Sequence, residues 1–330
     1  MLKKAAGYLA TFFIIITINF FIPRLMPGDP FTFLSSEEGQ VIITYSEEQI
    51  EKYKAYYGLD KPLLVQYANY LTKLLAGDIG YSIYYNGSVI SVLGKRMLWT
   101  MSIVAAAIFV SFLSGTLLGC VSAWRRKGLL DQLLYGMMIA LSEIPAFLIG
   151  VVFLFLLSAR LGLFPLSGGM TTFAGYGNFL EQVKDIVHHA ALPVLTLSMV
   201  RLGEFYLISR SSMMTVLAKD YMRTARAKGL AGGRILFVHA LKNAIPPVVT
   251  RVFLSLGAVF GGAVLVENVF NYPGVGRLMR EAVLVRDYVL LQGIFLLMAV
   301  TVLTMNLLAD VVNRRLDPRL AEGDVRANAG

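Results

Sequence analysis

Long runs of apolar residues, separated by shorter charged or polar segments, extend through most of the chain. A helix needs roughly 20 apolar residues to cross a bilayer core about 30 Å thick. By this measure the runs predict six spans, at about residues 8–26, 98–123, 132–158, 189–208, 244–266 and 288–310. Residues 97–123 and 288–309 contain no charged side chain. We therefore expect an all-α polytopic membrane protein with six transmembrane helices.

The composition supports this expectation, and the distribution of charges predicts how the chain is oriented in the membrane. Of the 330 residues, 56% are hydrophobic and 15% are charged, and the mean hydropathy is +0.65, which excludes an ordinary soluble domain. The net charge of +9 comes largely from short segments around residues 3–4, 125–127, 210–242 and 314–326. Basic residues gather on the cytoplasmic side of membrane proteins. This distribution predicts two cytoplasmic termini and no nucleic-acid partner.

The spacing of the spans divides the chain into four parts. The first apolar run is longer than a signal-peptide core and no small-residue cleavage site follows it, so residues 1–26 are expected to remain as the N-terminus and first transmembrane helix. Residues 27–97 are expected to be an extracytoplasmic helical region. Residues 98–313 then form a transmembrane core of five helices, which contains a cytoplasmic segment at 209–243. Residues 314–330 form a cytoplasmic tail.

Two helices are predicted in the outer region, between the first two spans. Ser46 to Gln49 form a capping box that starts a short helix, with a stop near Gly58. Pro62 suits the first turn of a second helix through residues 63–75, which stops near Gly77. Tyrosines are frequent here, and they serve either packing and interface anchoring or a platform for an external partner. These tyrosines are Tyr53, Tyr56, Tyr57, Tyr67, Tyr70, Tyr81, Tyr84 and Tyr85.

Motifs for catalysis, nucleotide binding or metal binding are missing from the sequence. There is no G-x-x-x-x-G-K-[ST], no H-E-x-x-H and no C-x-x-C. The single cysteine, Cys120, lies in an apolar run and is expected to be a small packing group. His188 and His189 are adjacent, so on a helix they point about 100° apart and rarely share one metal. We expect a transport subunit with no catalytic residue, cofactor or metal of its own.

In the basic segment before the fifth predicted span, glycines separate two short predicted helices. Asp220 is expected to cap a helix over residues 221–228, which Gly229 ends in a left-handed conformation. A further break at residues 232–233 precedes a second helix over about 234–243, before Pro246 and Pro247 open the next span. Orientation or contact with anionic lipid would account for the charge. The helix–glycine–helix pattern also fits a docking surface for a soluble partner.

Motifs spread over nearly the whole chain resemble a known family, and their order is highly specific. They are residues 27–30 (PGDP), 57–62 (YGLDKP), 77–80 (GDIG), 220–230 (DYMRTARAKGL), 239–244 (HALKNA), 269–278 (VFNYPGVGRL) and 316–319 (LDPR). On these motifs the chain resembles the inner-membrane permease subunit of binding-protein-dependent ABC importers, in the dipeptide, oligopeptide and nickel group.

The resemblance implies that the 220–230 motif is the coupling helix that sits on the ATPase subunit. Aligned on Gly229, the family's E-A-A positions are Arg223, Thr224 and Ala225, so the leading Glu is absent, as in the peptide and nickel subgroup. The residues it assigns to ATPase coupling are Asp220, Tyr221, Arg223, Thr224, Ala225, Arg226, Ala227, Lys228, Gly229, Leu230, His239 and Leu241.

The resemblance also implies the partners and the reaction. A second homologous permease subunit would complete a heterodimer, two ABC ATPase subunits would bind ATP and Mg, and an extracytoplasmic solute-binding protein would deliver substrate. The assembly would import peptides by alternating access across the bacterial or archaeal cytoplasmic (inner) membrane. Nickel or a metal chelate is the alternative cargo within the family. A stand-alone channel or secondary transporter is a further alternative, of another class.

Four ionisable residues fall inside predicted spans: Glu143, Arg201, Glu204 and Arg251. Each costs roughly 2.5–3.5 kcal/mol in mid-helix, so each is expected to face protein or water. Arg201 and Glu204 are three apart on one helix face and can pair, whereas Arg251 is near enough to the cytoplasmic end to snorkel. Two interpretations stay open: an interior ion-pair network, or the lining of a path for a charged or zwitterionic substrate. Pro145 and Pro193 are expected to kink their helices.

Overall fold

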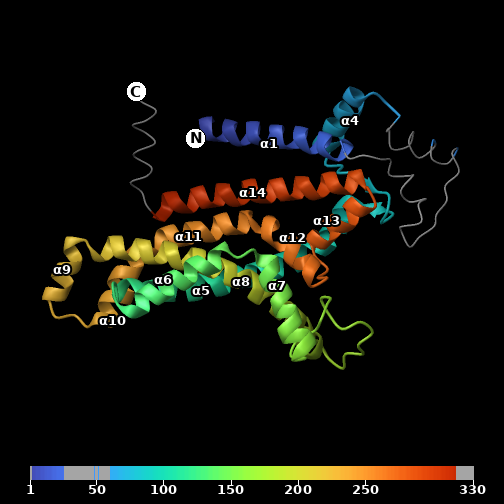
Figure 1. Ribbon diagram of the computed structural model, residues 1–330. Coiled ribbons are helices and arrows are strands. Elements are labelled where there is room, and N and C mark those ends of the chain that lie inside the picture. The colour runs from blue at the N-terminus through green and yellow to red at the C-terminus, as the bar shows by residue number, and fades with distance from the viewer. Residues whose placement is uncertain (1, 26–47, 49–50, 52–59, 317–330) are drawn as a thin grey trace. The chain divides into compact units, whose positions relative to one another are not determined.

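The computed structural model describes residues 2–25 and 60–316, together with Glu48 and Glu51 (Figure 1). The predicted capping box at Ser46 to Gln49, the stop at Gly58, the 27–30 motif and the tail beyond residue 316 lie outside the described residues. So do Tyr53, Tyr56 and Tyr57. The described chain is mostly helical, as the sequence predicts.

The chain clusters into two compact units. The first contains residues 1–99 and 273–303, and the second contains residues 100–272 and 304–330. Helices α5 (Val89–Trp124) and α14 (Tyr288–Leu316) each contribute to both units. The other elements of the first unit are α1 (Leu2–Arg24), α4 (Leu63–Leu75), β1 (Tyr81–Ser82), β2 (Gly87–Ser88) and α13 (Val275–Leu284). The other elements of the second unit are α6 (Leu129–Glu143), α7 (Ala146–Phe153), the π-helical η1 (Leu154–Arg160), α8 (Phe179–Leu217), α9 (Asp220–Ala227), α10 (Gly232–Arg234), the π-helical η2 (Ile235–Ala240), α11 (Leu241–Gly257) and α12 (Val259–Val269).

In the first unit, α1 is tied to both α4 and α14. The side chain of Asn19 donates to the Gln292 carbonyl at 2.9 Å, which joins α1 to α14. The Thr17 hydroxyl and the Tyr67 hydroxyl lie 2.7 Å apart, and the Phe20 ring packs edge-on against Tyr67. The predicted helix over 63–75 is confirmed at these bounds, and Gly77 follows it with φ +79°.

The antiparallel hairpin of β1 and β2 is fixed to α13 and to the start of α14. The Ser82 hydroxyl donates to the Asp287 carboxylate at 2.6 Å, and the Tyr85 hydroxyl donates to Glu281. Burial, followed by the nearby Glu281 carboxylate, raises the pKa of Tyr85 above its ordinary value. The tyrosines of the outer region therefore divide: Tyr67 and Tyr85 take part in packing, whereas Tyr84 is exposed.

In the second unit, α8 is the central helix and packs closely against its neighbours. A Cβ atom at Gly115 or Gly119 of α5 would lie within 3.0 Å of α8 backbone, and one at Gly203 would lie 2.6 Å from the Met138 carbonyl of α6. Glycine permits these approaches because it has no side chain. The Ser212 hydroxyl of α8 donates to the Ala244 carbonyl of α11 at 2.7 Å.

The number of membrane-spanning helices depends on how two bent pairs are counted. By length and apolarity four helices can cross a membrane: residues 6–24, 89–124, 179–217 and 288–313. Two further pairs qualify together, 129–143 with 146–160 bent by 96°, and 232–257 with 262–269 bent by 60°. If each bent pair is one span, the number is six.

Two of the predicted spans are therefore not straight helices. Pro145 precedes α7 and has extended backbone (φ −57°, ψ 133°), so it breaks the third predicted span completely where the sequence suggested a kink. The fifth predicted span bends after Gly257. Pro193, by contrast, lies buried inside α8, which continues through it. The length and apolarity of a run predict a span but carry no information on its bend angle.

Candidate functional site

The segment between α8 and α11 contains the short helix α9, Asp220–Ala227. The helix begins after Lys219, which has extended backbone, and no side chain caps it. The prediction that Asp220 is the cap is therefore wrong: its carboxylate lies one position inside the helix, 3.6 Å from the Arg223 guanidinium. A carboxylate in the first turn still interacts favourably with the helix dipole.

Gly229 ends this helix as predicted. Its φ is +71°, and its N–H donates to the Arg226 carbonyl at 3.0 Å. Only glycine adopts this left-handed conformation without steric cost, so the residue fixes where α9 stops and how the chain turns.

The break predicted at residues 232–233 is wrong, because a helix begins there. Ala231 precedes α10 with extended backbone, and the helix then runs through η2 into α11 without interruption up to Gly257. Pro246 and Pro247 lie inside α11 and do not start it. Contact with α8 holds this helix together, because Ala244 and Val248 are buried and Ser212 bonds the Ala244 carbonyl. The helix–break–helix pattern remains, with its break confined to residues 228–231.

An apolar cluster anchors this segment to the ends of α5 and α8. Met222 of α9 is fully buried, and Ile235 and Leu236 of η2 are nearly so. Their partners in the cluster are Cys120, Ala123, Met213, Val216, Ala240 and Ala244. Cys120 is thus a buried packing residue, as the sequence predicts.

The residues predicted to couple to an ATPase divide into two groups. Ala225, Leu230 and Leu241 pack against the apolar cluster, and His239 is half-buried. The others are exposed, with the side chains of Asp220 and Arg223 at 96% and 81%. The exposed group is Asp220, Tyr221, Arg223, Thr224, Arg226, Ala227, Lys228 and Gly229. We call this group the exposed face of α9.

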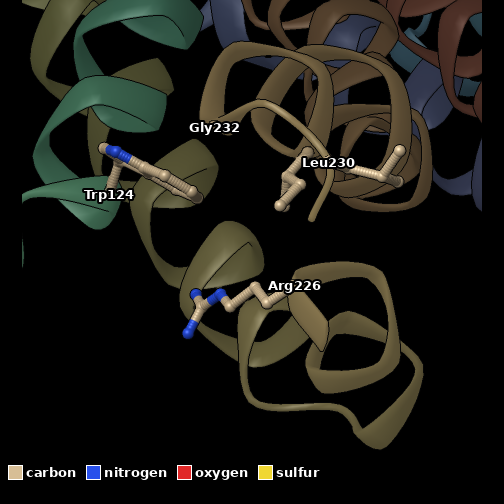
Figure 2. Close-up of a pocket in the computed structure, with 5 residues that line it drawn as sticks. Trp124, Arg226, Leu230 and Gly232 are labelled. Atoms are coloured by element: carbon tan, nitrogen blue, oxygen red, sulfur yellow. The ribbon is translucent and has the colours of Figure 1, made fainter. Parts of the chain in front are cut away.

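A hollow of about 280 Å³ lies behind α9, lined by Trp124, Arg226, Leu230, Gly232 and Ile235. Figure 2 shows the Trp124 and Arg226 side chains on different helices, with the chain at Leu230 and Gly232 closing the other side. The Arg226 guanidinium lies 5.7 Å from the Trp124 ring centre, which is a cation–π distance. Trp124 was missed in the sequence because it simply ends an apolar run.

Three of the four predicted intramembrane charges come together between α8 and α11. The Arg251 guanidinium donates to one carboxylate oxygen of Glu204 at 2.7 Å and 3.3 Å. The Arg201 guanidinium lies 3.8 Å from the same oxygen, so the predicted Arg201–Glu204 pair is confirmed as a charge contact. Arg251 does not snorkel toward a helix end but binds Glu204. We call Arg201, Glu204 and Arg251 the charged cluster.

Glu143 is not part of the charged cluster in the described structure. It is the last residue of α6, its side chain is exposed, and it forms no ion pair within residues 60–316. The neighbouring Ser142 hydroxyl lies against Gly203, one residue before Glu204. The end of α6 therefore reaches the level of the charged cluster along α8.

A buried ion pair that the sequence did not predict joins α6 to α8. Arg210 donates to both carboxylate oxygens of Asp131, at 2.7 Å and 2.9 Å. The Ser122 hydroxyl of α5 also donates to Asp131 and lies 2.6 Å from the Tyr206 hydroxyl. Arg210 had been counted only among the orienting basic residues. The available signal was a lone acid, Asp131, directly after a basic loop.

The family comparison covers almost the entire chain. Residues 115–322 match the family described as binding-protein-dependent transport system inner membrane component. Residues 1–104 match the N-terminal part of the membrane component of such systems.

Relatives of similar length also align with nearly the whole chain. The probable peptide ABC transporter permease protein y4tP of Sinorhizobium fredii is 32% identical over 97% of this chain and 98% of its own length. The dipeptide transport system permease protein DppB of Escherichia coli K12 is 32% identical with the same coverage. The glutathione transport system permease protein GsiC of Pectobacterium atrosepticum is 33% identical over 97% of each chain. The protein is therefore a multi-pass membrane protein and belongs to the inner membrane components of binding-protein-dependent transport systems.

Proposed function

We propose that this chain is the permease subunit of an ATP-driven importer of peptides. The observation that carries the proposal is the near full-length similarity to permeases named for peptide, dipeptide and glutathione transport. These names favour peptides over nickel as the cargo. The chain would supply the translocation path, and its partners would supply ATP hydrolysis and substrate capture.

The exposed face of α9 is the proposed contact with the ATPase. Two features support this assignment. The face presents Tyr221 and Arg223 outward, whereas Met222 and Ala225 hold the helix to the apolar cluster. A push on α9 would therefore be transmitted to the ends of α5 and α8 as a rigid displacement and not absorbed by a flexible loop.

The proposed assembly follows from binding-protein-dependent transport. A second homologous permease subunit would complete the path, two ATPase subunits would bind ATP and Mg, and a solute-binding protein would dock outside. With each bent pair as one span, the chain would cross the membrane six times with both termini in the cytoplasm. Residues 27–97 would then be extracytoplasmic, and 209–243 would form the coupling segment. The permease would alternate between inward- and outward-facing states during transport. ATP binding to the ATPase subunits would shift the relative populations of these two states.

Glu143 and the charged cluster are the proposed polar lining of the path. Ionisable side chains within spans face protein interior or water-filled cavities, because lipid does not solvate them. The cluster is only partly buried, and Glu143 is exposed, so both remain accessible to a polar substrate.

ATP-driven uptake in proteoliposomes tests the proposal. The chain would be co-expressed with its partner permease, ATPases and binding protein, and a labelled mixture of dipeptides and oligopeptides would be offered. We expect uptake that requires ATP and is abolished by substituting the phosphate-binding lysine of the ATPase. Peptide uptake without ATP hydrolysis would instead identify a stand-alone transporter, and nickel uptake alone would identify a metal importer.

A further inference from the structure

The charged cluster contains two cations and one anion. Glu204 offers a single oxygen to both arginines and is engaged by Arg251 at hydrogen-bonding distance. Arg201 lies at 3.8 Å, beyond hydrogen-bonding range, and within the described part of the chain its guanidinium makes no hydrogen bond. Yet the Arg201 side chain is only 15% exposed, compared with 33% for Glu204 and 36% for Arg251.

Among residues 100–272, this arrangement leaves one positive charge without a matching anion. The two guanidinium groups also repel each other, because both lie within 4 Å of the same Glu204 oxygen. A guanidinium carries five N–H donors, and burying them unpaired in a membrane span is unfavourable. The three side chains of the charged cluster therefore carry one more positive charge than negative charge.

The other acids of residues 100–272 do not supply that anion. Asp131 is bound by Arg210, Asp185 by Thr171, and Glu267 by Thr100. Glu181 accepts the Gly177 N–H at the start of α8, and Asp220 lies beside Arg223. Glu143 has an exposed side chain and forms no ion pair within residues 60–316. Within residues 100–272, the charge on Arg201 is met by Glu204 alone.

We propose that Arg201, with Arg251, is a binding site for the free C-terminal carboxylate of a peptide in transit. This inference rests on the proposed function as a peptide permease. A guanidinium matches a carboxylate with two parallel hydrogen bonds, and Arg201 has donors available for both. Glu204 stays on Arg251 and repels the incoming carboxylate, which keeps the site weak. A transport site must bind weakly enough to release its cargo.

The test compares two peptides that differ only at the C-terminus, a free acid and its carboxamide. ATP-driven uptake of both would be measured with the same binding protein, in wild type and in Arg201→Gln. We expect the acid-to-amide uptake ratio to fall by about tenfold in the variant, because the charge-assisted hydrogen bonds are lost only with the acid. Arg201→Lys should retain much of the ratio, since the positive charge remains.

Arg160→Gln is the matched control, because Arg160 is an exposed arginine at the end of η1, on another element. It should leave the ratio as in wild type. Equal acid-to-amide ratios in wild type and Arg201→Gln would overturn the proposal. Equal loss of both peptides, with Arg201→Lys equally impaired, would also overturn it and assign Arg201 a structural role.

A second measurement removes the binding protein's own preference. The purified complex without binding protein would be titrated with each peptide at millimolar concentration, and its Tm followed. In wild type we expect the acid to raise Tm more than the amide does. In Arg201→Gln we expect the two peptides to raise Tm by the same amount. No acid preference in wild type would overturn the carboxylate site. If wild type shows the preference in this titration but transports neither peptide, the proposed function fails and the site stands.

Discussion

Asp131 and Arg210 show what single residues do in this protein. Their side chains are 4% and 16% exposed, and Arg210 engages both carboxylate oxygens. The Lys127 N–H and the Ser122 hydroxyl complete the shell around Asp131, so every contact comes from α5, α6, α8 or the basic loop between α5 and α6. A pair with such a shell holds three helices together, directly beside the apolar cluster that anchors α9.

Asp131→Asn is expected to destabilise the complex. Removing one partner of a buried pair typically costs about 3–5 kcal/mol, because the other charge stays buried without compensation. Thermal unfolding of the permease pair, purified without its ATPase subunits, should show Tm lower by several degrees, and the double variant Asp131→Leu with Arg210→Met should recover much of the loss.

Asp220→Asn is the matched control in the same preparation without ATPase subunits, because Asp220 then lies beside Arg223 in an exposed pair. Exposed ion pairs contribute little to stability. Its Tm should equal that of wild type, and an equal Tm for Asp131→Asn would show that the buried pair is not structural.

Gly203 is the residue on which the contact between α6 and α8 depends. A Cβ atom there would lie 2.1 Å from the Ser142 hydroxyl and 2.6 Å from the Met138 carbonyl, so Gly203→Ala must push the helices apart. Overpacking of this kind costs about 1–3 kcal/mol. We expect a lower Tm together with slower peptide uptake, because the displaced end of α6 lies next to the charged cluster.

Gly136→Ala provides the comparison for Gly203→Ala on α6 itself, since a Cβ atom at Gly136 meets nothing within 4 Å. Alanine favours a helix over glycine by about 1 kcal/mol, so this variant should be as stable as wild type or more stable. Equal Tm values for the two alanine variants would contradict the close packing of α6 and α8.

At the scale of elements, the features that could be predicted from the sequence are the helix ends and turns that neighbouring residues determine. The bounds of α4, the start and end of α9 within a residue, and the left-handed Gly229 all follow from neighbouring proline, glycine and charge. The same rules failed at residues 232–233, where a helix begins with two glycines, and at Pro246, where a helix packed against α8 continues through proline. Pro145 breaks its span, whereas Pro193 is accommodated.

The candidate site shows the same division. The Arg201–Glu204 pair was predictable because the two residues lie on one helix face. The Arg251–Glu204 and Asp131–Arg210 pairs join residues 47 and 79 positions apart, and no local pattern encodes which distant helices meet. The resemblance gave the coupling residues as one set. It could not separate Ala225, Leu230 and Leu241, which hold the segment in place, from the exposed face of α9.

Tyr221→Ala combined with Arg223→Glu should weaken binding of the ATPase without disturbing the fold. Both side chains are exposed, so their loss removes contacts only from the proposed interface. Truncating or reversing central interface residues commonly costs 2 kcal/mol or more. Co-purification of the ATPase should fall by at least about tenfold, while Tm of the isolated permease pair stays unchanged.

Ala225→Glu is the informative contrast, because Ala225 packs against the apolar cluster. It should lower Tm as well as ATPase binding, since a charge would be forced against buried apolar side chains. Full ATPase retention by the Tyr221 and Arg223 double variant would remove the exposed face of α9 from the interface.

At the scale of the whole molecule, the two bent pairs decide how often the chain crosses the membrane. If the 129–143 and 146–160 helices form one span, residues 161–178 lie on the side opposite to the basic residues 125–127. If the pair is re-entrant, both lie on the same side. The six-span arrangement and the proposed orientation together predict which residues a reagent can reach from outside the cell. Labelling from each side of the membrane tests this prediction.

Single cysteines introduced into a Cys120→Ala background test this prediction. Cys120 is buried, and alanine leaves a small apolar group in its place. The positions would be Asn69→Cys on α4, Thr172→Cys after η1 and Arg126→Cys before α6, all of which are exposed. In intact cells whose outer envelope lets the reagent through, a maleimide that cannot cross the inner membrane should label the Asn69 and Thr172 variants. It should label the Arg126 variant only after the inner membrane is opened.

Labelling of the Thr172 variant only after opening would identify the bent pair as a re-entrant loop. The same result for the Asn69 variant, with Arg126 labelled from outside, would reverse the orientation and move the exposed face of α9 away from any cytoplasmic ATPase.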